Sequence, residues 1–233
     1  MNFHIGTSGF SYKEWKGSFY PKDLKDKEML SFYGQHFGTV EINNTFYRMP
    51  KVDVLEGWTE QVPESFRFVI KASRRISHMK RLNEVDDEAD YLFSTLDTLD
   101  DRLGAVLVQL PGNFKPNLDR LRSFIDLIPP HVRVAFEFRH ADWLCDEVYD
   151  CLRTKNASLV IADVDDADPP ALTVTADWIY LRLRREKYTK PTIKKWVNQI
   201  RETGVEEAFV FFKHEDAGTG PKLAKQMIEI VNA

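Results

Sequence analysis

The sequence predicts an α/β fold, a compact (β/α)8 TIM-type barrel in which residues 1–233 form one domain. Three observations predict it. Short apolar runs recur about every thirty residues, helical segments separate most of them, and 233 residues at 43% hydrophobic content can bury one sizeable core. Strands that alternate with helices indicate parallel βα units, and eight units in this length match a closed barrel better than an open sheet.

The expected strands are eight apolar runs. In chain order they are FHIGTS near residue 3, TVEIN near 39, FRFVIKA near 66, GAVLVQL near 104, VRVAFEF near 132, SLVIAD near 158, WIYLRLR near 178 and AFVFFK near 208. Residues 164–177 contain Pro169 and Pro170 and no amphipathic run. We therefore expect a connection without a full helix between the sixth and seventh strands.

Helical spacing of i, i+3, i+4 and i+7 marks the segments between strands. It is clearest in two sets of apolar residues: Leu92, Phe93, Leu96 and Leu99, and then Ile193, Trp196, Val197 and Ile200. The second set ends before Gly204, a residue typical of helix ends. Each set predicts one amphipathic helix that covers the barrel.

Composition sets limits on partners and location. The net charge of −4 and pI near 5.9 give no overall reason to expect nucleic acid or an anionic membrane surface as partner. Cys145 and Cys151 lack the spacing of a disulfide framework or zinc site. The N-terminal residues do not resemble a signal peptide and no run reaches transmembrane length, so we expect the cytoplasm. The sequence identifies no cofactor and no oligomeric state.

Polar residues gather where the expected strands end. Side chains alternate between the barrel interior and the surrounding helices, and we assign the bulky apolar parity outward. The inward set is then His4, Gly6, Ser8, Glu41, Asn43, Val69, Lys71, Ser73, Leu107, Gln109, Ala135, Glu137, Arg139, Ile161, Asp163, Tyr180, Arg182, Arg184, Phe212 and His214. Because barrel enzymes place their chemistry at the C-terminal strand ends, this ring predicts an active site.

An alternative interpretation is a buried ionic network that serves only to fix the barrel. Such networks seldom stabilise a protein more than apolar packing does, so the concentration of charge favours a site. Residues 71–84 add a basic rim with a single acid, Glu84. This rim favours an anionic ligand. Equally, its charges could pair with the acidic helix that follows.

Two further features extend the expected site. Gly218, Thr219 and Gly220 precede Pro221 at the start of the last helix, and exposed amides at such a junction bind phosphate in many barrels. The alternative is a plain turn with a helix cap. Aromatic residues also crowd the rims, where they would stack on a sugar or base or simply pack over the mouth: Tyr12, Trp15, Phe46, Tyr47, Trp143 and Tyr188.

Several blocks of this chain resemble one known family. The blocks are IGTSGFSYKEWKGSFYP, VEINNTFYRMP, FRFVIKASRRISHMKRL, LGAVLVQLP, EFRHADW and FVFFKHEDAGTGPKLA. They resemble the YecE-like family, domain of unknown function 72, over essentially the whole chain. The resemblance implies a TIM-type barrel and no established activity. It points to Ser8, Glu41, Asn43, Lys71, His78, Gln109, Glu137, Arg139, His140 and Arg182.

Two blocks depart from the commoner pattern of that family. YLRLRR stands where His-Gly often follows the leucine, and FFKHED stands where paired asparagines often follow the aromatic residue. These differences indicate a branch with a more charged rim. They leave open whether all members share one substrate.

The sequence leaves three functions open. The first is an enzyme, of unresolved hydrolase, lyase or isomerase class, that uses carboxylate acid/base chemistry and arginine clamps on a small anionic, phosphorylated or sugar-like ligand. The second is a metal-assisted phosphodiesterase on damaged nucleic acid, although no motif has metal-ligand spacing. The third is a binding module without turnover, for a metabolite or nucleic acid. A retaining glycosidase is disfavoured because Gln109 and Arg182 stand where its carboxylates would lie.

The first hypothesis assigns roles to named residues. The expected catalytic residues are Glu137, Asp163, Lys71 and Glu41. Glu137 is the first choice for general acid or base because burial raises the pKa of a carboxyl. The expected ligand-binding residues are Ser8, Asn43, Tyr47, Arg48, His78, Gln109, Arg139, His140, Trp143, Arg182, Arg184, Gly218, Thr219 and Gly220.

Overall fold

Eight parallel strands form the barrel in the computed structural model, which describes residues 1–165, 167 and 171–233. The strands are β1 (Asn2–Thr7), β2 (Thr39–Ile42), β3 (Arg67–Lys71), β4 (Leu103–Leu110), β5 (Val134–Phe138), β6 (Ser158–Asp163), β7 (Trp178–Leu183) and β8 (Glu207–Phe212). The neighbour order is β1-β8-β7-β6-β5-β4-β3-β2, so each strand from β2 to β8 lies beside the next in sequence, β8 lies beside β1, and β1 and β2 stand at the two ends of the order. The predicted (β/α)8 TIM-type fold is confirmed.

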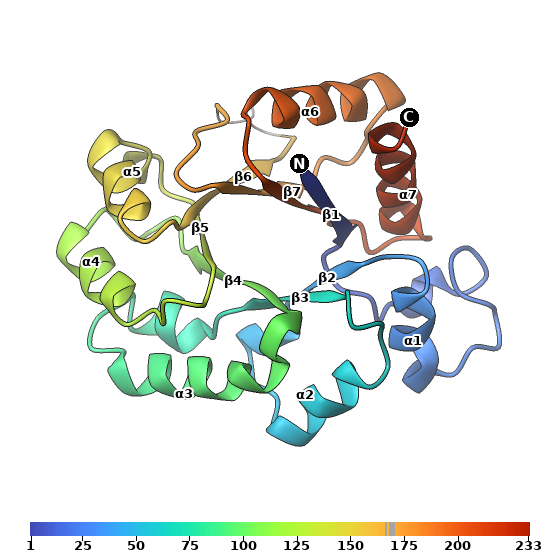
Figure 1. Ribbon diagram of the computed structural model, residues 1–233, viewed down its shortest axis with the longest axis horizontal. Coiled ribbons are helices and arrows are strands. Elements are labelled where there is room, and N and C mark those ends of the chain that lie inside the picture. Colours follow the sequence, from blue (N-terminus) through green and yellow to red (C-terminus); the bar gives the residue numbers. More distant parts are fainter. Residues whose placement is uncertain (166, 168–170) are drawn as a thin grey trace.

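Seven α-helices are described outside the strands, and Figure 1 shows them as a ring around the sheet. They are α1 (Met29–Gly34), α2 (Val52–Thr59), α3 (Asp86–Leu96), α4 (Leu118–Asp126), α5 (Asp146–Arg153), α6 (Lys190–Glu202) and α7 (Thr219–Val231). Helix α6 shows why they form. The Thr189 hydroxyl accepts a hydrogen bond from the Thr192 amide, and the predicted apolar face from Ile193 to Ile200 is buried.

The connection between β6 and β7 is irregular, as predicted. Its described residues, 164–165, 167 and 171–177, contain no helix. Pro169 and Pro170, on which the prediction rested, lie outside the described residues. Thr175 ties the end of this connection to the barrel, because its hydroxyl donates to the carbonyl of Ala157 and accepts from the amide of Leu159.

The barrel closes between β1 and β2 through little more than a bridge. Ser8 pairs with Glu41, and the amide of Gly9 donates to the carbonyl of Glu41 at 2.7 Å. Gly6 permits this close approach, because a Cβ at that position would lie 2.2 Å from the carbonyl oxygen of Thr39. The sequence therefore places its smallest residue where the first and second strands meet.

Two apolar layers lie on opposite faces of the sheet. The inner layer consists of Val69, Ala105, Leu107, Ala135, Val160, Trp178, Tyr180, Phe209 and Phe211. The outer layer packs against the helices and includes Val40, Ile42, Ile70, Phe136 and Leu181. The predicted strand parity is therefore confirmed for β3, β4, β5 and β7.

The predicted parity is wrong for β6 and β8. Ile161 and Phe212 belong to the outer layer, whereas Val160, Phe209 and Phe211 face inward. The reason is physical: both runs are apolar at nearly every position, and strands buried on both faces carry no alternation from which a face can be read. The side chains of Asp163 and His214 consequently follow the outer parity.

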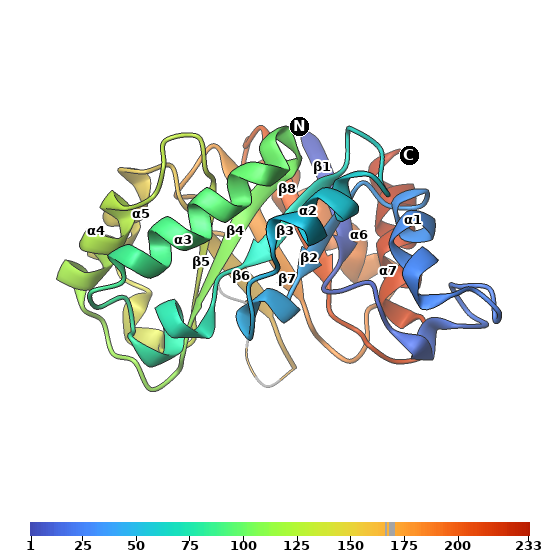
Figure 2. The same ribbon diagram turned by 90° about the horizontal axis from the view of Figure 1, so that it is seen from below.

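The two ends of the barrel differ in character. Figure 2 shows both chain termini at the end where the strands begin, while the strand ends open on the opposite side. Within the described ranges, none of the helices combines the length and apolar character that a membrane crossing requires.

Candidate functional site

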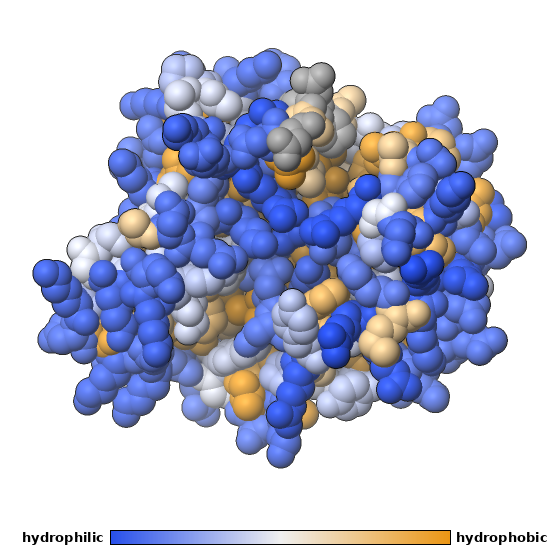
Figure 3. Space-filling view, turned by 180° about the vertical axis from the view of Figure 1, so that it is seen from behind, coloured by the Kyte–Doolittle hydropathy of each residue, from blue (hydrophilic) through white to orange (hydrophobic). Residues whose placement is uncertain are grey.

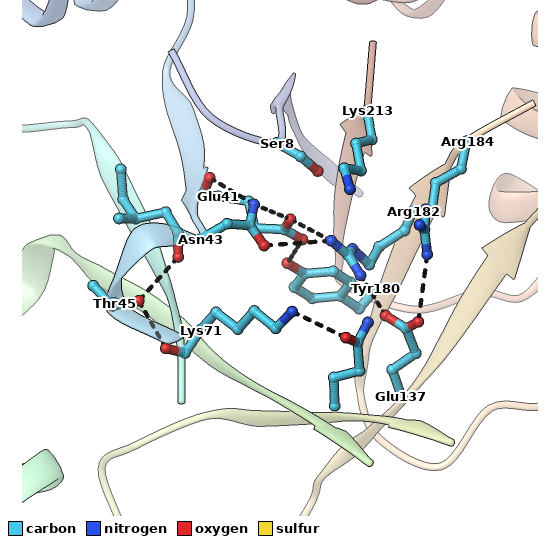
Figure 4. A network of polar contacts seen from close by, with 12 residues as sticks. Ser8, Glu41, Asn43, Thr45, Lys71, Glu137, Tyr180, Arg182, Arg184 and Lys213 are labelled. Carbon is cyan, nitrogen blue, oxygen red and sulfur yellow. Dashed lines mark hydrogen bonds and ion pairs between the residues drawn. The ribbon is translucent and has the colours of Figure 1, made fainter. Parts of the chain in front are cut away.

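A buried ion-pair network lies where β2, β5 and β7 end. Arg182 donates from Nη2 to Oε1 of Glu41 at 2.8 Å and from Nη1 to Oε2 of Glu137 at 2.6 Å. The three residues are at most 2% exposed. We call Glu41, Glu137, Arg182 and Tyr180 the floor of the mouth (Figure 4). The inward side chain of Glu41 thus meets an arginine of β7.

Neighbouring polar groups donate further hydrogen bonds to the carboxylate of Glu41. The Tyr180 hydroxyl donates to Oε2 at 2.6 Å, and Asn43 donates from Nδ2 to Oε1 at 2.8 Å. Ser8 lies near enough to help lower the pKa of the Glu41 carboxyl, although its Oγ makes no hydrogen bond of good geometry with a described residue. Burial opposes ionisation of Glu41, but the charge of Arg182 and these donors hold its pKa below the usual range. Glu41 is therefore a carboxylate fixed on all sides.

The pKa of Glu137 is lowered, whereas the sequence-based expectation was a raised pKa. Burial alone would raise it, but the charge and hydrogen bond of Arg182, followed by the charge of Arg139, lower it to about 2. Glu137 is thus ionised at neutral pH and holds no proton to donate as a general acid. The sequence-based expectation of a raised pKa is wrong, because Arg182 lies closer than strand parity alone could indicate.

Above the floor opens a cavity of about 400 Å³. Its lining residues are Tyr12, Asn43, Phe46, Tyr47, Lys71, His78, Gln109, Arg139, Arg182, Arg184, Lys213 and Glu215. We call Lys71, Arg139, Arg184 and Lys213 the cationic wall. Figure 3 shows this face of the molecule, where the most hydrophilic colours gather near its middle. Glu215 is the one carboxylate among these lining residues.

The segment after β2 shapes one side of the cavity. Residues Asn44–Phe46 form a 3-10 turn, and the Thr45 hydroxyl lies 2.7 Å from the carbonyl of Lys71 and 3.2 Å from that of Ile42. Thr45 thereby ties the end of β2 to the end of β3. The turn places the Phe46 ring beneath the Lys71 ammonium, 4.3 Å from its centroid.

Lys71 lies in an unusual environment for a lysine. Its Nζ donates to Oε1 of Gln109 at 2.9 Å, and it forms no ion pair with any described residue. Burial and then the charge of Arg182 lower the pKa of Lys71 to about 8, although Glu41 and Glu137 oppose the shift. Lys71 therefore gives up its proton more readily than an ordinary lysine.

His78 faces the same cavity from a single π-helical turn, Arg75–Met79. Its ring packs edge-on against Phe46 with 4.8 Å between centroids. Burial, and next the charge of Lys71, lower the pKa of His78 below its ordinary value. Non-glycine residues with positive φ follow this turn, at Arg81, Leu82 and Glu84, so the backbone is strained next to the cavity.

Asp163 lies outside the barrel interior. Its carboxylate accepts hydrogen bonds from the Tyr188 hydroxyl, the Trp196 indole and Nε of Arg185. These partners belong to α6 and the segment before it. The expectation that Asp163 points inward as a second active-site carboxylate is therefore wrong, because β6 is apolar on both faces and its parity was misassigned. Its position indicates a structural role between β6 and α6.

Other residues expected in the site lie beside the cavity. Arg48 lines a neighbouring hollow with Met49 and Tyr91. His140 accepts from the amide of Asp142 and starts a 3-10 turn. Trp143 is fully buried and donates to the carbonyl of Phe114. The structure does not bring these three residues to the mouth.

The expected phosphate loop is also separate from the cavity. Gly218 adopts a left-handed φ of 78° and lines a different hollow with Ser18 and Phe19. The Thr219 hydroxyl donates to the Asp216 carboxylate at 3.2 Å. Gly220 is buried, where an added Cβ would lie 3.0 Å from the carbonyl of His214. The Asp216 carboxylate thus lies beside the start of α7, in contact with the Thr219 hydroxyl.

The basic rim after β3 is partly neutralised, as the alternative interpretation expected. Arg75 and Lys80 both pair with Glu88 of α3, at 2.6 and 2.8 Å. Arg74 instead lies over the exposed Tyr47 ring at 5.9 Å. The positive surplus at the mouth therefore comes from the strand ends more than from this loop.

The expected catalytic and ligand-binding residues omit five residues that shape the site, although Tyr180 was assigned to the inward set and Tyr12 and Phe46 to the rim aromatics. The five are Tyr12, Phe46, Tyr180, Lys213 and Glu215. Lys213 and Glu215 follow β8, whose apolar run hid its parity. Counting from Phe211 as an inward residue would have found both. Phe46 and Tyr12 had a signal as rim aromatics, but aromatic residues on a rim are common and do not identify contacts.

The donor set at the mouth bears on metal binding. Within the described residues, no three His, Cys, Asp or Glu side chains are grouped so as to hold a metal ion. The two floor carboxylates already bind Arg182, and the cationic wall faces the same space. Any cation entering here would meet like charge.

Fold and site together define a (β/α)8-barrel protein with a cationic pocket at the C-terminal mouth. The chain belongs to the family described as "Protein of unknown function DUF72", whose model matches residues 4–233. The sequence-based resemblance to the YecE-like family is thereby confirmed.

Named relatives agree with this membership. The protein YecE of Escherichia coli K12 is 37% identical over 112 residues, 48% of this chain and 41% of YecE, so the matched region spans less than half of that relative. The protein YunF of Bacillus subtilis is 23% identical over 98% of this chain and 94% of its own length.

Solved structures of the same family share the fold. A DUF72 protein of Thermotoga maritima gives a TM-score of 0.86 at 25% identity, with all of both chains covered. A DUF72 protein of Enterococcus faecalis gives 0.82 at 20% identity, covering 99% of this chain and 96% of the other.

Proposed function

We propose that this protein is an enzyme that binds a small anionic molecule, phosphorylated or carboxylated, in the mouth of the barrel. One observation carries the proposal: the four side chains of the cationic wall, from the ends of β3, β5, β7 and β8, line one cavity together with Arg182, and Glu215 is the single carboxylate among its described lining residues. Enzymes of this architecture work at this end of the barrel. The cavity volume of about 400 Å³ lies in the range of small-molecule sites, which favours a metabolite over nucleic acid.

The charge of the cationic wall is incompletely neutralised. Arg139 and Arg184 lie 3.5 and 3.8 Å from Oε1 of Glu137, a carboxylate that already holds Arg182. Lys213 lies 4.0 Å from Glu215. Charge-assisted hydrogen bonds to an incoming phosphate or carboxylate would complete these contacts.

Two buried donors in the cavity also support a ligand. Nε of Arg182 and Nε2 of Gln109 have no hydrogen-bond partner of good geometry among the described residues, although the Gln109 amide lies near enough to Glu137 to help lower its pKa. Unpaired buried donors are rare because each costs free energy. An oxygen-rich ligand seated on the floor would accept from them.

The reactive groups we assign to this enzyme are Lys71 and His78. Glu137 binds Arg182 as a carboxylate with a pKa of about 2, which makes it a weak base at neutral pH. Lys71 and His78 both have lowered pKa values and line the cavity. Groups that titrate near neutral pH suit acid/base and nucleophilic chemistry.

Calorimetric titration tests anion binding with glycerol 3-phosphate as the probe and glycerol as its uncharged counterpart. We expect saturable binding of the phosphate ester only, competed by inorganic phosphate. Arg184→Gln and Lys213→Gln should each weaken it about tenfold or more, since each removes a charge-assisted contact.

The exposed Lys194 supplies the matched control, because Lys194→Gln also removes one positive charge but lies on the outer helix α6. Lys222→Gln, at the start of α7, tests the separate hollow. Equal affinity for all variants, or loss only in Lys222→Gln, would overturn the proposed site.

A further inference from the structure

We infer that Lys71 forms a Schiff base with an aldehyde or ketone whose phosphate or carboxylate group is held by the other members of the cationic wall. This inference rests on the proposed anion site and names its substrate class as small carbonyl compounds that carry an anionic group. The proposed Schiff-base chemistry uses neither the Gly218–Gly220 segment nor a carboxylic acid as proton donor. The contacts of Lys71 and its position across the mouth from Arg184 and Lys213 (Figure 4) support this inference.

The contacts of Lys71 leave its amine available for chemistry. Two other lysines of this chain, Lys16 and Lys80, meet the carboxylates of Asp26 and Glu88. Lys71 instead meets a neutral amide oxygen at 2.9 Å and an aromatic face at 4.3 Å. Neither the amide oxygen nor the aromatic ring carries the negative charge with which a carboxylate would stabilise the ammonium form of Lys71. A lysine whose charge is not paired and is partly desolvated becomes nucleophilic.

The charges that face Lys71 support the same conclusion. Arg182 from β7 and Arg139 from β5 disfavour a further positive charge, whereas Glu41 and Glu137 favour it. The balance, with burial as the largest cause, gives the lowered pKa of about 8. At pH 7 about one such amine in ten is neutral, against about one in three thousand for an ordinary lysine.

The wall places an anionic group within the same cavity as Nζ of Lys71. Arg184 and Lys213 extend toward the floor from the ends of β7 and β8, across the mouth from Lys71 (Figure 4). A ligand that spans the mouth can thus bind its anion at one side and present a carbonyl carbon at the other. Positioning of this kind supplies much of the rate of a bimolecular addition.

The covalent step balances without an oxidant or reductant. The Nζ lone pair adds to the carbonyl carbon, the C=O π pair moves to oxygen, and a proton passes from nitrogen to that oxygen to give a carbinolamine. The carbinolamine then takes up a second proton and loses water, leaving a C=N⁺ bond on Lys71. The resulting iminium is an electron sink for cleavage or proton transfer at the adjacent carbon.

His78 is placed to carry those protons. The Ser77 hydroxyl lies 3.2 Å from the carbonyl of Ser73 and 2.9 Å from Nδ1 of His78. A carbonyl only accepts, so a single arrangement gives each contact a hydrogen: Ser77 donates to Ser73, and Nδ1–H of His78 donates to Ser77. Nε2 then keeps its lone pair as a proton acceptor for the cavity.

Reductive trapping tests the inference on the full-length protein. The probe is glyceraldehyde 3-phosphate, with glyceraldehyde as its uncharged counterpart and sodium cyanoborohydride to reduce any imine. Peptide mass spectrometry then reports the modified lysines. We expect Lys71 to be modified at least about tenfold faster than any other lysine, and only by the phosphorylated aldehyde. Inorganic phosphate should suppress the reaction.

The pH profile and two variants separate a reactive lysine from an accessible one. The trapping rate at Lys71 should rise up to about pH 8 and then level off, whereas an ordinary lysine keeps gaining reactivity toward its pKa of 10.5. Lys71→Arg keeps the positive charge but removes the amine, so trapping at this position should be lost. Calorimetry with glycerol 3-phosphate and thermal unfolding of this variant report the state of its anion site and its fold. Lys71→Met removes both charge and amine, and its thermal unfolding reports whether the fold survives.

Calorimetry and reductive trapping test the anion site and the Schiff base separately. Anion binding by calorimetry without preferential modification of Lys71 overturns the Schiff-base inference and leaves the proposed anion site standing. Absence of anion binding overturns the proposed function and this inference together. Equal trapping by both aldehydes also overturns the inference, because it removes the role of the wall.

Discussion

The floor of the mouth and the cationic wall above it both contain arginine and balance positive charge in opposite ways. In the floor, Arg182 lies between Glu41 and Glu137, and every charge has a hydrogen-bonded partner. In the wall, Lys71 has no ion pair with a described residue, and Arg184 only approaches a carboxylate that is already bound. The floor is fully buried, whereas the wall is half-exposed.

This contrast indicates where each function lies. Charge can be buried only when it is paired, so the floor must be self-sufficient and its carboxylates are committed to Arg182. Surplus charge is tolerated where solvent or a ligand reaches it. The catalytic potential of the mouth therefore rests with the wall, and the floor holds the strand ends in place beneath it.

Removing the central arginine should disrupt the floor most severely. Arg182→Met removes the buried cation that Glu41 and Glu137 share, and we expect the free energy of unfolding to fall by about 3–5 kcal/mol in urea titrations. Arg184→Met provides the matched control, because its side chain is part-exposed and should change stability by less than about 1 kcal/mol. Similar losses in the two variants would contradict the distinction between floor and wall.

Acid should cause the second-largest loss of stability, by protonating Glu137 in the floor. The pKa of Glu137 is about 2 in the folded protein against 4.5 ordinarily, so the unfolded chain binds more protons between these values. The stabilisation is complete above pH 4.5 and is lost as the pH falls toward 2, by roughly 3 kcal/mol.

Urea titrations at pH 7, 5 and 3 measure this dependence. Glu137→Gln cannot titrate at that position, so its stability should fall less steeply between pH 5 and 3 than that of the unchanged protein. Parallel pH profiles for the two proteins would show that Glu137 is not held ionised by Arg182.

A carboxylate outside the barrel should have a smaller effect, confined to stability. Asp163→Ala removes the acceptor for Tyr188 and Trp196, and we expect a loss of about 1–3 kcal/mol. Its affinity for glycerol 3-phosphate should equal that of the unchanged protein, because Asp163 does not line the cavity. A lower affinity of a folded Asp163→Ala protein for glycerol 3-phosphate would show that Asp163 contributes to the binding site.

The sequence allowed most of this architecture to be predicted, for a clear reason. Strand alternation in VEIN and VAFEF let Glu41 and Glu137 be assigned inward correctly, because an apolar outer face and a polar inner face differ in kind. SLVIAD and AFVFF are apolar on both faces, so the side of Asp163 and Lys213 could not be read from them.

The pKa values of the site residues could not be predicted from the sequence. Burial of Glu137 was foreseeable, but its pKa depends on the 2.6 Å contact with Arg182, a residue 45 positions away. The same holds for Lys71, whose lowered pKa arises from burial together with charges on several other strands. Patterns of residue type locate side chains on a face, whereas pKa values require the distances between them.

Diffraction from crystals soaked in tungstate is the decisive measurement for an anion site at the mouth, because tungstate is a tetrahedral dianion like phosphate and is located by its anomalous signal. We expect a peak within hydrogen-bond distance of at least two members of the cationic wall, above Arg182, that disappears in Arg184→Gln crystals. A peak only at Gly218–Gly220 or along the Arg74 loop, with none at the mouth, would contradict an anion site formed by the wall.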